Sequence, residues 1–213
     1  MPRPAAVLQV EGLGFAHPKQ PALFINWSSA IAPGVTWLGG DEHTGKTTLL
    51  RLLAGELGAQ QGSLRINGVA LAEQPAAYLS QVAWVDPRTQ AFDALTPHAV
   101  WERLRNQHPT WNAALLADLI DGLGLASHLA KSLTMLSTGT KRKVFLAGTL
   151  ASGAAVTLLD EPFAALDRAS IDLLLDLLQE AARHPSRAWV VADYVAPPGV
   201  GLAGVVELRE REG

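Results

Sequence analysis

Short hydrophobic runs alternate along the chain with segments whose hydrophobic residues recur at helical spacing. The runs predict buried strands, and they cover residues 7–10, 35–38, 154–159, 189–192 and 205–208. Residues 170–179 predict a helix packed on a core, because four of their side chains follow the i, i+3, i+4, i+7 pattern of one helical face: Ile171, Leu174, Leu175 and Leu178. Strands that alternate with helices are typical of an α/β protein with a mainly parallel sheet.

Two parts of the chain depart from this alternation. Residues 62–68 place Leu64 and Ile66 on one face and then turn at Asn67-Gly68, which predicts antiparallel hairpin strands. Between residues 87 and 150 strand patterns are scarce, and helices are expected at 99–105, 112–123 and 141–150. We therefore expect a single domain over residues 1–213. In it, residues 1–86 and 151–213 form the α/β core with its antiparallel part, and residues 87–150 form an inserted helical subdomain.

Composition narrows the classes of protein to consider. The 213 residues are 48% hydrophobic, enough for a substantial core, and the net charge of −3 disfavours a general nucleic-acid-binding surface. Cysteine is absent, so the chain has neither disulfides nor thiolate metal sites. No hydrophobic run approaches the roughly 20 residues of a membrane-spanning helix, and the first ten residues lack the apolar stretch of a secretory signal. We expect a soluble, cytoplasmic chain that would reach a membrane only through a partner.

Residues 39–48, Gly-Gly-Asp-Glu-His-Thr-Gly-Lys-Thr-Thr, contain the pattern G-x-x-x-x-G-K-[ST] between a predicted strand and a predicted helix that Gly55 ends. In that context backbone N–H groups surround phosphate oxygens, Lys46 reaches the outer phosphates and the Thr47 hydroxyl ligates Mg²⁺. A glycine turn that happens to precede a helix is the alternative. The predicted nucleotide-binding residues of the loop are Gly40, Asp41, Glu42, His43, Thr44, Gly45, Lys46, Thr47 and Thr48.

A second candidate lies at the end of the hydrophobic run 155–159, which Asp160, Glu161 and Pro162 follow. A carboxylate at the end of such a strand holds Mg²⁺ opposite the glycine loop in P-loop proteins, and Asp160 is placed for that. Glu161 is placed to polarise an attacking water as general base. A solvated acidic turn is the alternative reading.

Residues 158–167, Leu-Leu-Asp-Glu-Pro-Phe-Ala-Ala-Leu-Asp, resemble the second nucleotide-binding motif of the ATP-binding cassette (ABC) ATPases and the aspartate-containing loop after it. The resemblance covers nearly the whole chain in the family's order. It implies a P-loop NTPase fold, with ATP and Mg²⁺ as cofactors. It also implies that Phe15 stacks on the adenine and that Asp167 contacts a second subunit.

Residues 136–140, Leu-Ser-Thr-Gly-Thr, lie where the family carries its signature sequence, usually Leu-Ser-Gly-Gly-Gln. Ser137 and Gly139 precede a helix expected to begin near Thr140, so that hydroxyl, amides and helix dipole point at an anion. In similar proteins this anion is the γ-phosphate bound to the opposite subunit; an ordinary serine cap is the alternative. Three basic residues, expected to strengthen the positive field, come next: Lys141, Arg142 and Lys143.

The chain departs from the family's pattern at three places. Thr138 and Thr140 replace a glycine and the glutamine of the signature. Asp86 stands where a loop glutamine that senses Mg²⁺ is expected, and Asp193 stands where a histidine contacts the γ-phosphate. An ionised Asp193 would repel phosphate. Two glutamines near residue 86 are alternatives for the loop glutamine: Gln81 and Gln90.

From these residues we expect Mg-ATP binding with slow hydrolysis. The catalytic residues are Glu161, Lys46 and Asp193, and the predicted metal ligands are Thr47, Asp160 and Asp86. Outside the glycine loop, the resemblance adds three nucleotide-binding residues: Phe15, Ser137 and Gly139.

The resemblance implies the ATPase of a membrane transporter. It would act with a second ABC ATPase subunit, identical or different, and with separate transmembrane permease subunits that hold it at the inner face of the membrane. The compact chain is similar to bacterial exporter cassettes, including those of cytochrome c haem maturation. A nucleotide-responsive regulatory module with little turnover is the main alternative. A soluble ABC ATPase of DNA repair or translation is disfavoured, because the surface is not strongly basic, and no nucleic-acid partner is expected.

Overall fold

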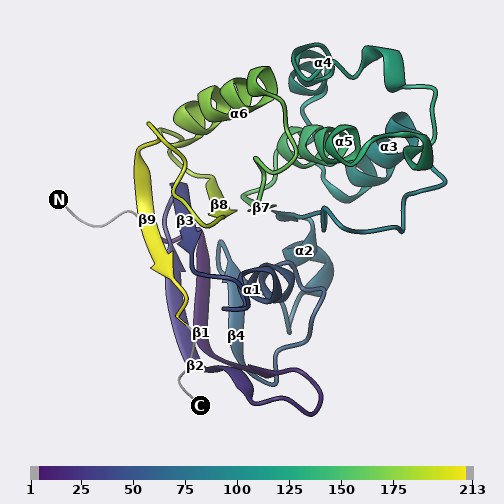
Figure 1. Ribbon diagram of the computed structural model, residues 1–213. Helices are drawn as coiled ribbons and strands as arrows, with labels where there is room; N and C mark the ends of the chain where they lie inside the picture. Colours follow the sequence, from purple (N-terminus) through teal and green to yellow (C-terminus); the bar gives the residue numbers. More distant parts are fainter. Residues whose placement is uncertain (1–4, 210–213) are drawn as a thin grey trace.

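The computed structural model describes residues 5–209, so the outermost ends of the predicted domain 1–213 lie outside the described residues (Figure 1). The strands are β1 (Leu8–Ala16), β2 (Ala22–Ile31), β3 (Gly34–Gly39), β4 (Gln61–Ile66), β5 (Val69–Ala70), β6 (Val82–Ala83), β7 (Val156–Asp160), β8 (Ala188–Ala192) and β9 (Leu202–Glu207). The α-helices are α1 (Lys46–Leu53), α2 (Pro75–Leu79), α3 (Pro97–Gln107), α4 (Ala113–Gly122), α5 (Thr138–Ala151) and α6 (Arg168–Ala181). Two short 3₁₀ helices are η1 (Ala126–His128) and η2 (Leu133–Met135).

The strands form two sheets. One has the order β6-β7-β8-β3-β9, and each neighbouring pair in it is parallel. The other has the order β2-β1-β4-β5 and is antiparallel throughout. The predicted fold class, a mainly parallel sheet with an antiparallel part and inserted helices, is confirmed.

The inner strands of the parallel sheet, β3, β7 and β8, are buried on both faces, whereas the edge strand β9 has no fully buried residue. The alternation of the inner strands divides the interior into two cores. Leu158 and Val190 face the first core, which α1 and the antiparallel sheet complete. Leu159 and Val191, the next residues along each strand, face the second core with α3 to α6. Because successive side chains of a strand point to opposite faces, one hydrophobic run serves both layers.

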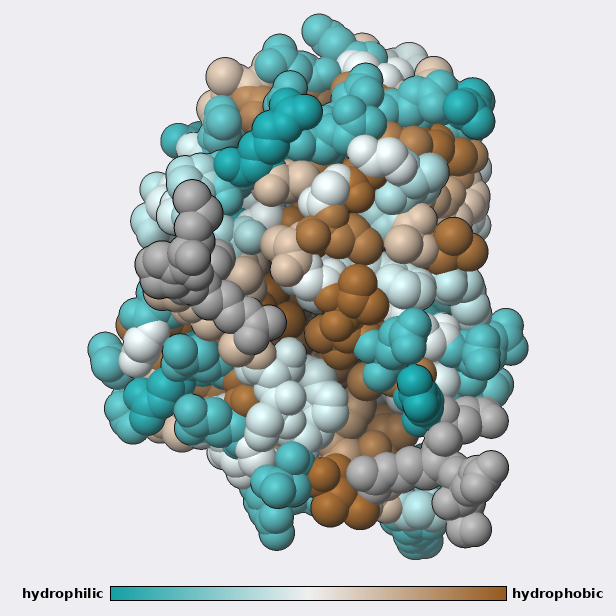
Figure 2. Space-filling model, turned by 90° about the vertical axis from the view of Figure 1, so that its left-hand side faces the viewer, coloured by the Kyte–Doolittle hydropathy of each residue, from teal (hydrophilic) through white to brown (hydrophobic). Residues whose placement is uncertain are grey.

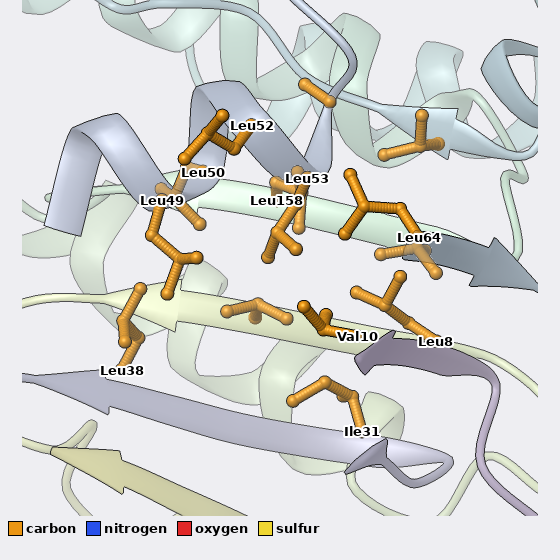
Figure 3. Packing of buried hydrophobic residues seen from close by; sticks show 14 of the residues in the cluster. Leu8, Val10, Ile31, Leu38, Leu49, Leu50, Leu52, Leu53, Leu64 and Leu158 are labelled. Atoms are coloured by element: carbon orange, nitrogen blue, oxygen red, sulfur yellow. The ribbon is translucent and has the colours of Figure 1, made fainter. Parts of the chain in front are cut away.

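The first core is the one that holds α1 in place. Figure 3 shows the leucines of α1 pointing toward the strands, with Leu158 and Leu38 from the parallel sheet and Leu8 and Leu64 from the antiparallel sheet. Since α1 follows the glycine loop directly, the packing of its leucines sets where that loop lies.

The residues between β6 and β7 form helices and connections without a strand, throughout residues 84–155, all of which the structure describes. Three helices there have a side-chain cap that accepts a hydrogen bond from the first turn, in the way expected of these residue types. The caps are Thr96 for α3, Asn112 for α4 and Ser137 for α5. The division of residues 87–150 from the core as a separate helical subdomain stays a prediction.

Several elements were not foreseen from the hydrophobic pattern. β1 continues to Ala16 through a bulge at Gly12, whose φ is +62°, and β2 is a ten-residue strand in which only Phe24 and Ile31 are buried. Hydrophobic residues are frequent in β2, but they occupy exposed as well as buried positions, so no regular two-residue alternation marks the strand. The short elements α2 and β6 were missed as well, because two to five residues are too few to show a period. By contrast, β5 pairs antiparallel with β4 around Asn67-Gly68, as the predicted hairpin requires.

Hydrophobic residues also reach the surface beside β9. Figure 2 shows this face, with hydrophobic residues exposed across its middle and hydrophilic residues around them. A groove of about 310 Å³ lies there between residues of β2 and β9, and Val205 is 57% exposed. None of the helices within residues 5–209 is long and apolar enough to cross a membrane.

We expect Leu50→Ala to lower the free energy of unfolding by about 2–5 kcal/mol, because the Leu50 side chain of α1 is fully buried in the first core and its truncation leaves a cavity. Urea unfolding followed by circular dichroism measures the change. Ile25→Ala, at a site that is 59% exposed, is the control and should change it little. Equal effects of the two substitutions would contradict this account of the core.

Candidate functional site

The glycine loop connects the end of β3 to the start of α1, as the sequence predicts. A Cβ on Gly40 would lie 2.7 Å from the backbone oxygen of Leu208, so the close approach of two backbone segments requires glycine there. Gly45, directly before α1, has φ of +95°. His43 has φ of +63°, a left-handed conformation that costs an L-residue about 1 kcal/mol. The loop thus keeps its shape despite a bulky residue.

A cavity of about 530 Å³ opens beside this loop. Its wall includes most of the residues predicted from the loop, together with residues from the ends of β1, β7 and β8 and from the connection after β6. They are His17, Gln20, Leu23, Asp41, Glu42, His43, Gly45, Lys46, Thr47, Thr48, Arg88, Glu161 and Tyr194. Gly40 and Thr44 lie behind the wall: the Thr44 hydroxyl is turned back to the backbone oxygen of Asp41 (2.9 Å).

Lys46 is 6% exposed, and its ammonium group is fully engaged by the chain itself. The Nζ atom donates to the backbone oxygens of Gly40 (2.5 Å) and Asp41 (2.8 Å) and lies 4.2 Å from the centre of the Tyr194 ring. Both the carbonyl bonds and the cation–π contact hold the ammonium at the loop. To reach a phosphate, Lys46 would exchange these carbonyl oxygens for phosphate oxygens.

Thr47 and Asp160 lie together, as predicted for a magnesium site. The Thr47 hydroxyl donates to Asp160 Oδ2 (2.7 Å), which joins the start of α1 to the end of β7. The two oxygens have the right chemistry for Mg²⁺. However, Arg88 Nη2 donates to both of them, at 3.1 Å to Thr47 and 3.3 Å to Asp160. The Arg88 guanidinium therefore occupies the place where the metal ion is expected. As arranged, Thr47 and Asp160 cannot also bind Mg²⁺ there.

Burial makes the ionised form of the Asp160 carboxylate unfavourable relative to its protonated form. Its pKa is raised above the ordinary value mainly by burial, while the Thr47 hydrogen bond and the Arg88 charge oppose that shift. Arg88 thus supplies part of the compensation that a buried carboxylate requires.

Glu161 lies on the wall of the cavity, as the general-base prediction requires. Its φ is +44°, and its backbone is held on both sides: its N–H donates to the Ala192 oxygen (2.8 Å) and its carbonyl accepts from the Arg142 guanidinium. A strained backbone that is fixed by neighbouring bonds is typical of functional positions. The role of Glu161 as base stays a prediction.

The wall beyond β8 contains Tyr194 rather than Asp193, which corrects the sequence-based placement. Asp193 continues directly from the buried strand and is half-buried, and its Oδ1 accepts from the Tyr194 backbone N–H (2.7 Å). Burial raises the pKa of Asp193, and the nearby Glu161 charge adds to the shift. Tyr194 therefore presents its side chain to the cavity, while Asp193 lies outside the cavity wall, and a role of Asp193 in repelling phosphate stays a prediction.

Phe15 is also corrected. It is 7% exposed and belongs to the first core, because it lies within β1, whereas His17 lies just past the end of that strand and lines the cavity. The two rings meet edge to face with centres 4.9 Å apart, and His17 Nε2 shares a hydrogen bond with the Thr48 hydroxyl (3.2 Å). The ring that lines the cavity is thus the half-buried His17, and Phe15 packs against it.

The loop after β6 differs from the prediction as well. Asp86, expected as a metal ligand, points its carboxylate at Arg88, and Arg88 lines the cavity in its place. Gln81 instead bonds to Asn67 (3.0 Å), and Gln90 is exposed outside the cavity wall. The sequence reasoning passed over Arg88 because it looked for an amide or a carboxylate at this place, although a basic residue two positions after Asp86 was visible.

The signature residues lie at the start of α5, outside the cavity of their own chain. Ser137 caps the helix by accepting from the Thr140 backbone N–H (3.2 Å), and α5 begins at Thr138, two residues earlier than expected. A Cβ on Gly139 would lie 2.4 Å from the backbone oxygen of Ala165, so packing against Ala165 already requires glycine at this position. An anion contact from Ser137 or Gly139 therefore stays a prediction that requires a second chain.

The basic residues after the signature do not form the free positive field that the sequence suggested. Each is bound within the chain: Lys141 to Asp93 (2.6 Å), Arg142 to the Glu161 carbonyl and Lys143 to Asp167. Asp167 also caps α6 by accepting from the Ser170 N–H (2.9 Å), and its pKa is lowered mainly by the Lys143 contact. These side chains stabilise the helical part of the chain.

Comparison with known sequences gives one consistent result. A family model described as "ABC transporter" matches residues 28–164. The "Cytochrome c biogenesis ATP-binding export protein CcmA" of Pseudomonas syringae pv. syringae is 35% identical over 149 residues, which are 69% of each chain. The protein of the same name from Rhodospirillum rubrum is 37% identical over 179 residues, 80% of this chain and 72% of that protein.

Solved structures agree with the fold. A chain described as "Structure of ATP binding subunit of ABC transporter" superposes with a TM-score of 0.79 at 22% identity, covering 89% of this chain and 80% of that one. A putative ABC transporter ATP-binding protein from Pyrococcus furiosus gives a TM-score of 0.73 at 21% identity, covering 94% and 96%.

We expect Asp193→Asn to raise the free energy of unfolding at pH 7. The folded protein holds Asp193 with a raised pKa, so its charged form costs stability that grows as the pH rises through the interval between the ordinary and the raised value. The asparagine oxygen can still accept from the Tyr194 N–H. The gain should vanish below about pH 3.5, where the carboxyl is protonated in both states.

Urea unfolding at several pH values measures this difference. Asp121→Asn, which removes an exposed carboxylate of α4, controls for the change in net charge. A gain that is constant across the pH range would show that the Asp193 charge is not its cause.

Proposed function

The chain belongs to the ABC transporter family as an ATP-binding ATPase subunit, and from this premise we propose that it powers an exporter by binding ATP in the cavity beside Lys46. The observation that carries the proposal is the arrangement of the cavity. The glycine loop, the start of α1 and Lys46 lie on one side, and Glu161 lies on the other. Backbone N–H groups at a helix start together with a lysine are the groups that bind a triphosphate.

In this proposal His17 carries the adenine and the loop carries the phosphates. His17 lies at the end of β1, supported by Phe15 and by Thr48, and its ring is part of the wall. Thr48, the last of the predicted loop residues, directly follows Lys46 and Thr47, so its bond to His17 would connect the two ends of the nucleotide site.

A second ATP-binding subunit, identical or different, completes the active site. Support comes from the position of Ser137 and Gly139, which start α5 but lie outside the cavity of their own chain. Two subunits that close on ATP would bring each signature to the partner's cavity. Separate membrane-spanning permease subunits would hold the pair at the inner face of the membrane, and residues 87–150 would move as one subdomain.

Export is the direction that the relatives suggest. Several are named cytochrome c biogenesis ATP-binding export proteins, and we extend to this chain a role in the same kind of export step. Two measurements would test this assignment: co-purification with a permease encoded by a neighbouring gene, and stimulation of ATP turnover by that permease.

Hydrolysis is proposed to be slow. Glu161 is present to polarise a water, but Arg88 covers the Thr47–Asp160 pair. On the part of the cavity wall that follows β8, Tyr194 takes the place of the family's histidine, and Asp193 lies behind it. These same residues favour the alternative of a nucleotide-responsive regulatory subunit, in which closure on ATP matters more than turnover.

Lys46→Ala should weaken ATP binding by more than about tenfold, because it removes the charge that reaches the outer phosphates. Isothermal titration calorimetry measures the dissociation constant, and Lys131→Ala, a lysine remote from the loop, is the control. Unchanged affinity in Lys46→Ala would remove the cavity as the nucleotide site.

Glu161→Gln should lower ATP turnover by about 10²-fold or more, since general-base catalysis contributes effects of that size, and leave ATP affinity nearly unchanged. Phosphate release from the purified protein measures the rate. Equal rates in the two proteins would exclude Glu161 as the base.

A further inference from the structure

The guanidinium of Arg88 bridges the two oxygens that a P-loop protein offers to its metal ion. Nη2 donates to the Thr47 hydroxyl (3.1 Å) and to Asp160 Oδ2 (3.3 Å). The Asp160 side chain is only 3% exposed, whereas that of Arg88 is 64% exposed and forms part of the cavity wall. Arg88 therefore lies between the buried carboxylate and the space where a nucleotide would lie.

Asp86 holds Arg88 in this position. Asp86 Oδ1 accepts from the backbone N–H of Arg88 (2.9 Å) and from its Nε (3.4 Å), and the Asp86 carbonyl accepts from the Thr89 N–H (3.0 Å). Pro87 fixes one backbone angle inside the same turn. The carboxylate thus binds one edge of the arginine while Nη2 reaches Thr47 and Asp160, so the orientation of the side chain is determined at both ends.

Charge explains why a cation belongs at this place. Asp160, Glu161 and Asp86 lie close enough for the charges of Glu161 and Asp86 to act on Asp160, and Arg88 opposes them. Lys46, the other cation of the wall, is occupied by the loop carbonyls and the Tyr194 ring. An arginine stays protonated at every physiological pH and has five donors, so it can bind a carboxylate and still offer N–H groups to a phosphate.

We propose that Arg88 takes the place of the divalent cation in this site, so that the chain binds ATP with its own guanidinium as counter-charge and needs no metal ion for binding. Both a metal ion and a guanidinium can join a carboxylate to a phosphate, but they cannot occupy the same position between Thr47 and Asp160. Arg88 is then a specificity-determining residue, which makes the site one for metal-free nucleotide. The inference rests on the proposed ATP site.

The test measures ATP affinity by isothermal titration calorimetry, in buffer with magnesium and in buffer with excess EDTA. For the unaltered protein we expect dissociation constants that agree within about threefold. In Arg88→Gln we expect binding in EDTA to weaken by about tenfold or more and magnesium to restore it, since the oxygen pair is then free for a metal ion. Arg105→Gln, an exposed arginine of α3, is the matched control and should behave as the unaltered protein does.

Asp86→Asn tests the positioning of Arg88. It should weaken binding in EDTA by less than Arg88→Gln does, and magnesium should restore part of the loss. A purely structural effect of Asp86 would weaken binding equally in both buffers, which would contradict the positioning role. The comparison of the two buffers for the unaltered protein stands even if either variant fails to fold.

Two results would overturn the proposal. If magnesium tightens binding by the unaltered protein about tenfold or more, and Arg88→Gln shows the same dependence, then the guanidinium withdraws before the metal–nucleotide complex and replaces nothing. If the unaltered protein binds ATP in neither buffer, the nucleotide site itself is wrong and the inference falls with it. The two failures are distinguishable, because the first shows metal-dependent binding and the second shows none.

Discussion

The hydrogen bond from the Thr47 hydroxyl to Asp160 is the contact on which the site depends, because it joins two segments that are remote in sequence. Thr47 lies in the first turn of α1 and Asp160 ends β7, and 2.7 Å separates their oxygens. The bond needs α1 seated on the first core and β7 paired between β6 and β8. The cavity for a nucleotide is a consequence of that arrangement.

The parallel sheet makes the arrangement possible. Its inner strands β3, β7 and β8 are buried on both faces. Their carboxyl ends meet at one edge, where the glycine loop, Glu161 and Asp193 follow them. Chain segments that leave such an edge converge on whatever binds there. Two hydrophobic cores pack on either side of the sheet, and Figure 3 shows the leucines of α1 in the first of them.

The phosphate-binding side of the cavity follows the family's pattern, and the opposite side does not. The glycine loop tolerates His43 because its grip depends on backbone geometry, which the glycines on either side preserve. Across the cavity, the Arg88 guanidinium lies where the resemblance implied the amide of a glutamine, and the Tyr194 phenol lies where it implied the imidazole of a histidine. The cavity thus has the glycine loop and Lys46 on one side, and Arg88 and Tyr194 on the side where the family's pattern changes. That combination is the ground on which we propose slow turnover.

The sequence by itself determined the fold class, the glycine loop, Lys46, Thr47 and the acidic pair at residues 160–161. Each depends on local backbone geometry or on the spacing of buried residues. Only the tertiary structure decided which side chains face the cavity: His17 instead of Phe15, Tyr194 instead of Asp193, Arg88 instead of Asp86. In each pair the residue that lines the cavity comes one or two positions after the one expected, in the connection that follows a strand. There the alternation of the strand stops, and the direction of a side chain depends on contacts from other elements, such as Thr48 for His17 and the Thr47–Asp160 pair for Arg88.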